Sequence, residues 1–264
     1  MKLYILNFII SILTFSSIIL SADEKKIITI AGDIWPPMSC SSHSKNKGLM
    51  VDITERIFSD AGYKVIYKTM PWARCIREAE EGTVNAIIGA HHNDAPDFIF
   101  PKTAIMRISA NSFFVLKENP WRFNGLKSLD EVRVGATIGY DYNDEALNNY
   151  LKKNKKKNVF LLAGEETMPM HIRKLISRRV DVIIAASPVF FNFLKELKIK
   201  DQFTFAGRMT EPQNCYIAFS PNIKLNSQKL TKIFDKGFKA LEKQGIIKEA
   251  FSKYGLNYNK YKSE

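Results

Sequence analysis

The chain has 264 residues, of which 45% are hydrophobic and 25% are charged, which is enough for one large domain or two modest ones. Its formal net charge is +12 and its pI is about 9.5, values that also occur in nucleic-acid-binding proteins. The densest basic run, 152–157, has no aromatic residues between its lysines. We therefore interpret it as a solvated surface and do not expect nucleic acid as a partner.

Residues 1–22 differ in composition from the rest of the chain. Lys2 provides a short positive start, an apolar run covers 3–20, and the small residues Ser21 and Ala22 follow it. This order is typical of a secretory signal peptide, although the run also approaches the length of an uncleaved membrane anchor. Because polar residues interrupt the run, we predict a signal peptide and a periplasmic location.

Strands and helices are predicted to alternate after this segment, in the order typical of α/β sheets. The first unit has strands at 27–30, 63–68 and 84–89, the last of them apolar throughout and so central, and helices at 50–61 and 72–81. A strand at 108–116 and a linker at 117–125 precede the second unit. Its predicted strands are 132–135, 159–162, 181–185, 203–205 and 215–219, and its helices are 142–153, 170–178 and 188–197.

Two further helices, at 227–243 and 246–254, are predicted to end the chain without strands of their own. They must therefore pack on a sheet that is already formed. We predict two lobes between which the chain crosses more than once, at 112–120 and 208–216.

Cys40, Cys75 and Cys215 allow at most one internal disulfide. We favour Cys40–Cys75 because both residues follow tryptophan-proline loops, with three free thiols as the alternative. The cysteines and the four histidines lack the spacing of metal ligands, so neither a metal nor a cofactor is expected.

Several short motifs occur in a specific order. They are Trp35-Pro36-Pro37 after the first strand, the helix start 48–52, Gly62-Tyr63, the segment 82–89, the segment 126–130 before Val134-Gly135, and the segment 179–184. With this order and spacing, the chain resembles the periplasmic solute-binding proteins of ABC transporters, amino-acid-binding family (family 3).

The resemblance implies a type II periplasmic binding protein fold, in which two α/β lobes with mixed, mostly parallel sheets are joined by a hinge. The first lobe would comprise 23–114 and 214–264, and the second 115–213. It also implies that a monomer delivers a small-molecule solute to a membrane permease.

Two features of amino-acid binders in this family are missing. An arginine after the third strand usually grips the solute carboxylate, but the segment 90–96 contains no arginine. An acidic residue after the strand near 182–184 usually takes the ammonium, but here Ala185 and Ala186 follow. We therefore do not predict specificity for α-amino acids.

Two tryptophans lie beside prolines at the ends of predicted elements. Trp35 precedes Pro36 and Pro37, and Trp72 follows Pro71. Prolines restrict the backbone, and ligands of open α/β sheets bind at the carboxyl ends of strands. We predict that both indoles line the binding site, with packing inside a lobe as the alternative.

Two arginines are candidates for binding an anionic group of the solute. Arg74 lies two residues into the helix that begins at Trp72, and Arg107 precedes the crossing strand. An exposed helix surface is the alternative for Arg74.

The turn 136–141 joins a strand to a helix, where backbone N–H groups and the helix dipole are available. Thr137, Gly139 and Tyr140 are its predicted contribution to the site, with an ordinary turn as the alternative. Ala90, His91 and Asn93 follow the central strand, and Ser187 follows a strand of the second lobe, so they complete the candidate set.

The sequence lacks a nucleophile elbow, a phosphate-binding glycine loop and a metal motif. We therefore predict a binding protein, not an enzyme, that captures a small polar or anionic solute, amino-acid-like or related, by hinge closure. A dehydratase-like periplasmic enzyme on the same fold and a solute-sensing module of a membrane receptor are the alternatives.

Overall fold

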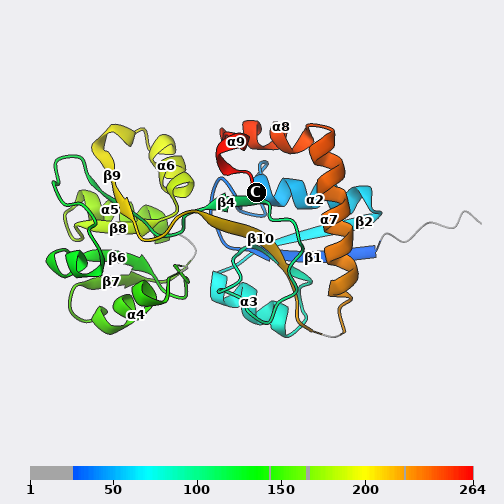
Figure 1. The fold of residues 1–264 in the computed structure, drawn as a ribbon, viewed down its shortest axis with the longest axis horizontal. Helices are drawn as coiled ribbons and strands as arrows, with labels where there is room; N and C mark the ends of the chain where they lie inside the picture. The colour runs from blue at the N-terminus through cyan, green and yellow to red at the C-terminus, as the bar shows by residue number, and fades with distance from the viewer. Residues whose placement is uncertain (1–25, 143, 165–166, 223, 264) are drawn as a thin grey trace, which may run out of the picture.

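Two five-stranded sheets lie side by side in the computed structural model, which describes residues 26–142, 144–164, 167–222 and 224–263 (Figure 1). The first sheet has the order β2-β1-β3-β10-β4, and the second has the order β7-β6-β8-β5-β9. The strands of the first sheet are β1 (Lys26–Gly32), β2 (Tyr63–Thr69), β3 (Ala86–Ala90), β4 (Met106–Ile108) and β10 (Gln213–Phe219). Those of the second are β5 (Ser112–Leu116), β6 (Val134–Thr137), β7 (Val159–Leu162), β8 (Val182–Ala185) and β9 (Phe203–Arg208).

The predicted two-lobe α/β fold is confirmed, and β3 is central as expected. Each sheet has two parallel and two antiparallel strand pairings, so the sheets are mixed but less parallel than predicted. The antiparallel pairs all involve β5 or β10. These strands follow the crossings between the lobes, so they enter their sheets from the opposite end.

The chain crosses between the sheets at 109–111 and at 209–212. The second crossing lies within the predicted segment. The first lies earlier than the predicted crossing at 112–120, because 112–116 is already β5 of the second sheet. The two crossings are joined at Asn111, whose side chain donates to Thr210 Oγ1 (2.7 Å) and to the carbonyl of Tyr142 (2.8 Å).

Helices cover both sheets. The first lobe has α2 (Leu49–Asp60), α3 (Trp72–Glu80), α7 (Ser227–Lys243), α8 (Ile246–Lys253) and the short α9 (Tyr258–Tyr261). The second has α4 (Glu145–Asn154), α5 (Thr167–Ile176) and α6 (Ser187–Glu196), with 3₁₀ turns η1 (Leu126–Glu131) and η2 (Lys200–Gln202). The C-terminal helices pack on the first sheet as predicted (Figure 1).

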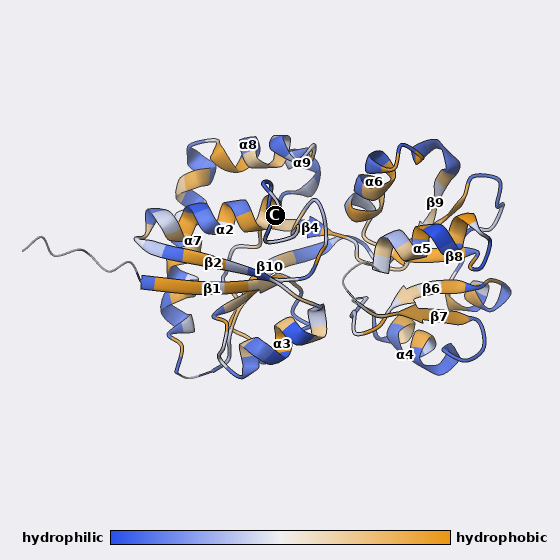
Figure 2. Cartoon of the chain, turned by 180° about the vertical axis from the view of Figure 1, so that it is seen from behind, coloured by the Kyte–Doolittle hydropathy of each residue, from blue (hydrophilic) through white to orange (hydrophobic). Residues whose placement is uncertain are grey.

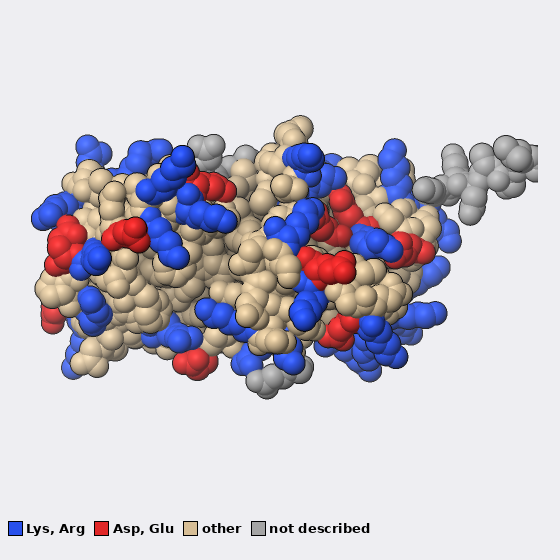
Figure 3. Space-filling model, turned by 90° about the horizontal axis from the view of Figure 1, so that it is seen from above, with Lys and Arg blue, Asp and Glu red and all other residues tan. Residues whose placement is uncertain are grey.

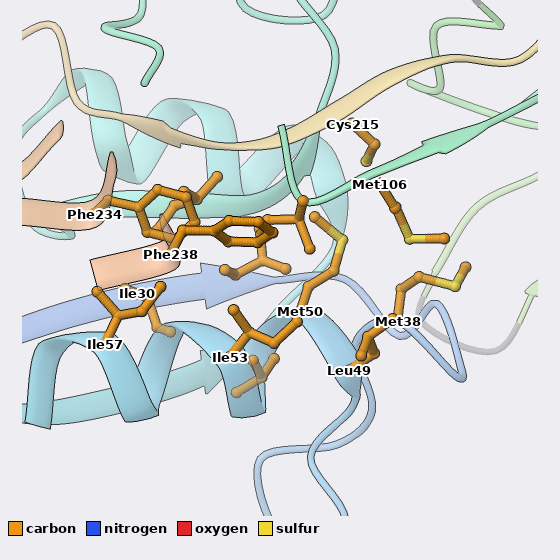
Figure 4. Close-up of a cluster of buried hydrophobic side chains, with 14 of the residues drawn as sticks. Ile30, Met38, Leu49, Met50, Ile53, Ile57, Met106, Cys215, Phe234 and Phe238 are labelled. Carbon is orange, nitrogen blue, oxygen red and sulfur yellow. The ribbon is translucent and has the colours of Figure 1, made fainter. Parts of the chain in front are cut away.

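The largest core lies between the first sheet and helices α2, α7 and α8. Figure 4 shows Ile53 and Ile57 of α2 close to Phe234 and Phe238 of α7 and to Ile30 of β1. All five side chains are at most 3% exposed. In the second lobe, Figure 2 shows hydrophobic residues along β6 and β7, with hydrophilic residues in the loops around them.

Lysines and arginines are distributed over both lobes on the face seen in Figure 3, interspersed with acidic residues. Among the described residues, no helix is long and apolar enough to span a membrane. The predicted signal peptide, 1–22, lies outside the described residues.

The three cysteines are free thiols, so the predicted Cys40–Cys75 disulfide is not formed. Cys75 is buried in the cluster that α3 forms under the first sheet. The backbone carbonyl of Cys40 accepts a hydrogen bond from Tyr67, whose ring belongs to the core on the opposite face of that sheet. Cys40 and Cys75 both follow tryptophan-proline loops, but this shared position does not bring their thiols together.

Helices α2 and α7 approach closely at Gly237. A β-carbon on Gly237 would lie 2.6 Å from Cγ2 of Ile57. We expect Gly237→Ala to lower the free energy of unfolding by about 1 kcal/mol in urea denaturation, because this clash outweighs the higher helix propensity of alanine. Lys239→Ala, at an exposed position of α7, should change it little. A Gly237→Ala protein more stable than the parent would contradict this close packing.

Candidate functional site

A pocket of about 760 Å³, including its open mouth, lies between the two lobes. The lobes contribute similar numbers of lining residues: Asp33, Ile34, Trp35, Ser39, Trp72, Ile88, Gly89, His91 and Asp94 from the first, and Thr137, Tyr140, Asp141, Tyr142, Thr167, Met168, Ile184, Ala185, Ala186 and Val189 from the second, with Ala110 at the crossing. Many follow the carboxyl ends of β1, β3, β6 and β8, where ligands of α/β sheets bind.

A tight loop after β1 holds Trp35 at the pocket. The Trp35 N–H donates to the carbonyl of Ser39 (2.7 Å), and the Ser39 hydroxyl donates to the carbonyl of Asp33 (2.7 Å). The indole lies over Gly89, where a β-carbon would be 3.5 Å from the ring. The loop thus fixes an aromatic wall of the pocket, and a role of this indole in binding remains a prediction.

Trp72 forms a second aromatic wall at the start of α3. Pro71 is the N-cap residue, and the Trp72 side chain is only 9% exposed. It packs in the cluster beneath the first sheet and also lines the pocket. Trp72 therefore packs within its lobe, as the alternative proposed, and also reaches the pocket, where its role in binding remains a prediction.

The turn after β6 brings the second lobe against the first. The Tyr140 hydroxyl donates to Asp33 Oδ2 across the pocket, at 2.7 Å. Burial and the charge of Asp33 raise the pKa of Tyr140, so the hydroxyl remains a donor at neutral pH. Gly139 approaches Ala73, because a β-carbon at position 139 would lie 3.6 Å from Cβ of Ala73. This turn therefore contacts the first lobe at the pocket, as do Ala186 and Val189, which pack against the core of the first lobe.

The turn after β3 provides buried polar groups. The His91 N–H donates to Asp94 Oδ2 (2.8 Å), and His91 Nδ1 lies 2.9 Å from the carbonyl of Asn214, which can only accept. Burial lowers the pKa of His91 to about 4, so the ring is neutral. Its Nε2 is then an acceptor, and it has no partner among the described residues.

Asp94 is half-buried. Burial first, and then the charge of Asp141 in the other lobe, raise the pKa of Asp94 to about 7. Asp141 Oδ1 accepts a hydrogen bond from Asn148 (2.9 Å). Two acidic side chains from opposite lobes therefore line the same pocket.

Arg74 does not line the pocket. It lies two residues, or about 200°, around α3 from the buried Trp72. Its side chain is 56% exposed, and its Nε lies 3.1 Å from Glu78 Oε1. The predicted anion-binding role of Arg74 therefore has no geometric basis, and the alternative of an exposed helix residue describes it.

Five further candidates also lie outside the described lining. Arg107 donates to the carbonyl of Pro212 (3.0 Å), and Ser187 Oγ lies 3.1 Å from Ser112 Oγ. Ala90 is fully buried beside α3, because alternate residues of β3 face opposite sides of the sheet. Asn93 is exposed in the turn, and Gly139 faces Ala73. Of the predicted residues, Trp35, Trp72, His91, Thr137 and Tyr140 come together at the pocket.

The model of the bacterial extracellular solute-binding proteins, family 3, matches residues 27–257. The chain belongs to this family. It is therefore a solute-binding protein, and the pocket between the lobes is its candidate binding site.

Solved structures share the fold of this family 3 protein at low sequence identity. A substrate-binding protein of an ABC uptake transporter from Streptococcus pneumoniae, with bound histidine, is 20% identical, with a TM-score of 0.70 over 88% of this chain and 93% of that chain. A protein of glutathione import in Streptococcus mutans is 17% identical, with a TM-score of 0.71 over 91% and 98%. A histidine kinase sensor domain is 19% identical, with a TM-score of 0.70 over 88% and 97%. No curated protein sequence matches the chain.

The pocket of this family 3 protein contains acidic residues that the sequence did not single out. Asp33 and Asp141 follow strands of the two lobes, and Asp94 lies in the segment where the resemblance led us to expect an arginine. Tyr142 and Met168 also line the pocket without having been predicted. Only their position in the sequence could have identified them, because Asp33 and Asp141 each lie just beyond a predicted strand.

Proposed function

We propose that this protein captures a small solute by closure of its two lobes and delivers it to the permease of an ABC transporter. The observation that carries the proposal is the pocket, which is lined by both lobes and bridged by the hydrogen bond between Tyr140 and Asp33. A site divided between two lobes is complete only when they meet, which is how a hinged clamp recognises its solute. We further propose that the protein acts as a monomer and without turnover of the solute.

We also propose that the protein is exported to the periplasm after removal of residues 1–22. The residue pattern of this segment and the extracellular family support this location. N-terminal sequencing of the mature protein should give Asp23 as the first residue, and retention of Met1 in the exported fraction would contradict it.

The binding function is tested with purified protein from which bound solute has been removed. Trp35 and Trp72 line the pocket, whereas Trp121 packs in the core of the second lobe. In the Trp121→Phe protein, all tryptophan fluorescence therefore comes from the pocket, and a solute that binds should change it. At a concentration 100 times its Kd, the same solute should stabilise the protein by about 2.7 kcal/mol, or roughly 5–10 °C in Tm. A broad solute screen that changes neither quantity would contradict binding.

A sensing role is the second candidate, supported by the similarity to a histidine kinase sensor domain. Both roles use the same closure and differ in the membrane partner. Crosslinking in cells with solute present should join the protein to a permease if it serves transport, and to a receptor if it serves sensing.

A further inference from the structure

We propose that the solute is an organic cation with an N–H group and no carboxylate, held between Asp94 of the first lobe and Asp141 of the second. This inference rests on the proposed binding function and specifies its solute class. It replaces the anionic solute of the sequence analysis, which depended on Arg74 and Arg107, because neither arginine lines the pocket.

The charge of the lining supports a cation. Asp33, Asp94 and Asp141 line the pocket, while none of its described lining residues is lysine or arginine. The chain as a whole has the opposite balance, with 39 basic and 27 acidic residues. The acidic pocket is therefore not a consequence of overall composition. A solute carboxylate would be buried beside these aspartates without a cationic partner in the lining, which is costly.

His91 gives an independent indication of the solute's hydrogen-bonding groups. The side chain is 4% exposed, and Nδ1 donates to the carbonyl of Asn214. This leaves Nε2 as a buried acceptor with no partner among the described residues, at the lining of the pocket. A buried acceptor without a donor is costly, so the solute is expected to supply an N–H group.

The positions of these two carboxyl groups explain how a bound cation favours closure of the lobes. Asp94 and Asp141 line the pocket from opposite lobes, so closing an empty clamp brings their carboxyl groups toward each other, and repulsion between their ionised forms opposes closure. A cation between them changes this repulsion into attraction on both sides. Each of the two also accepts a hydrogen bond within its own lobe, Asp94 from the His91 N–H and Asp141 from Asn148, just as Asp33 accepts one from Tyr140.

The other walls fit an organic cation of some size. Trp35 and Trp72 provide aromatic faces, which attract cations and cover hydrocarbon. Ile34, Met168 and Val189 add apolar contacts. Among the described residues, no group of three or more His, Cys, Asp or Glu side chains could hold a metal ion. The pocket therefore favours an amine with an apolar or aromatic body over an inorganic cation.

Calorimetry with matched pairs of solutes tests the proposal. The probes are agmatine, cadaverine and tyramine, each compared with the parent amino acid that carries the additional carboxylate: arginine, lysine and tyrosine. We expect at least one amine to bind ten times more tightly than its parent. Equal or tighter binding of every parent, or no binding of any amine, would overturn the proposal. Mass spectrometry of the small molecule that copurifies with the protein gives a second measurement, and a solute with a carboxylate would also overturn it.

The two aspartates are tested by charge-neutralising variants. Asp94→Asn keeps an oxygen acceptor for the His91 N–H and should weaken binding of the best amine at least tenfold, as should Asp141→Asn. Asp97→Asn, three residues from Asp94 on the exposed side of the same turn, is the matched control and should bind normally. Thermal melts of each variant identify any loss of folding. Folded Asp94→Asn and Asp141→Asn proteins with normal amine affinity would overturn the assignment.

The pH dependence of amine binding provides another test. With the pKa of Asp94 at about 7, this group is largely protonated at pH 5.5 in the empty pocket and ionised at pH 8. A cation favours the ionised form, so affinity should be roughly tenfold lower at pH 5.5 than at pH 8. Neutral His91, with a pKa of about 4, does not titrate in this range. The dependence should disappear in Asp94→Asn, and equal affinity of the parent protein at both values would contradict the role of Asp94.

These measurements separate the proposal from the binding function on which it depends. A broad screen that finds an anionic or zwitterionic solute overturns the cation while supporting binding. A screen that finds no solute of any class overturns both.

Discussion

Replacing Gly48 by alanine is expected to lower the free energy of unfolding by about 3 kcal/mol and to weaken solute binding as well. Gly48 is the N-cap residue of α2, with φ of 112° and ψ of 153°, a conformation that is essentially restricted to glycine. A β-carbon there would lie 2.5 Å from the Met38 carbonyl oxygen and 2.7 Å from Ser39 Cα. Both are backbone atoms, so the clash is relieved only if the loop moves.

The loop that would move is the one that holds Trp35. Its carbonyls at Pro37 and Met38 accept hydrogen bonds from the N–H groups of Leu49 and Met50, both at 2.9 Å. Displacing this segment therefore disturbs the start of α2 and one wall of the pocket together. Stability and affinity should fall in the same variant because they depend on the same contact.

Gly62→Ala is the matched control for this prediction. Gly62 follows α2 and has φ of 82°, but a β-carbon there would meet nothing within 4 Å. The variant should lose about 1–2 kcal/mol for the left-handed conformation and should bind solute normally. Urea denaturation and fluorescence titration measure the two effects. Equal stability of Gly48→Ala and Gly62→Ala would show that the contact with the loop is unimportant.

The sequence predicted most elements of the fold because their hydrophobic patterns are strong. It failed where it predicted one strand over 108–116, because the structure has β4 over 106–108 and β5 over 112–116 in different lobes. The residues between them, Ser109 and Asn111, are buried and hydrogen-bonded to Thr210 in the other crossing. The local alternation of polar and apolar residues cannot distinguish a buried polar crossing from the polar positions of a strand. The hydrogen-bond partner of Ser109 and Asn111 lies about a hundred residues away in the sequence.

The site was predictable only in part, for a related reason. Trp35 and Tyr140 follow strands, so their edge of the sheet was evident from the sequence. Arg74 was chosen for its chemistry, although its position on α3 relative to Trp72 directs it to solvent. Asp33, Asp94 and Asp141 are isolated in sequence, and they become a set only when both lobes fold and meet.

Tyr140→Phe is expected to weaken solute binding by roughly tenfold to a hundredfold. The Tyr140 hydroxyl donates to the Asp33 carboxylate across the lobes at 2.7 Å, and Asp33 is 6% exposed. Hydrogen bonds to charged groups contribute about 1.5–3 kcal/mol, and leaving such a carboxylate buried without this donor carries a similar cost. Water can replace the Tyr140 hydroxyl when the lobes separate. The variant therefore loses the stabilisation of this hydrogen bond only in the closed state.

The expected size follows from linkage between closure and binding. A solute that binds the closed form must supply the free energy that the variant no longer gains on closing, and each 1.4 kcal/mol lowers affinity tenfold. Calorimetry measures the affinity, and small-angle X-ray scattering measures whether saturating solute still closes the lobes. Tyr150→Phe is the matched control, because the Tyr150 hydroxyl donates to Asp130 Oδ1 (2.9 Å) within the second lobe alone. If Tyr140→Phe binds solute as tightly as Tyr150→Phe does, the contact between Tyr140 and Asp33 contributes nothing to closure.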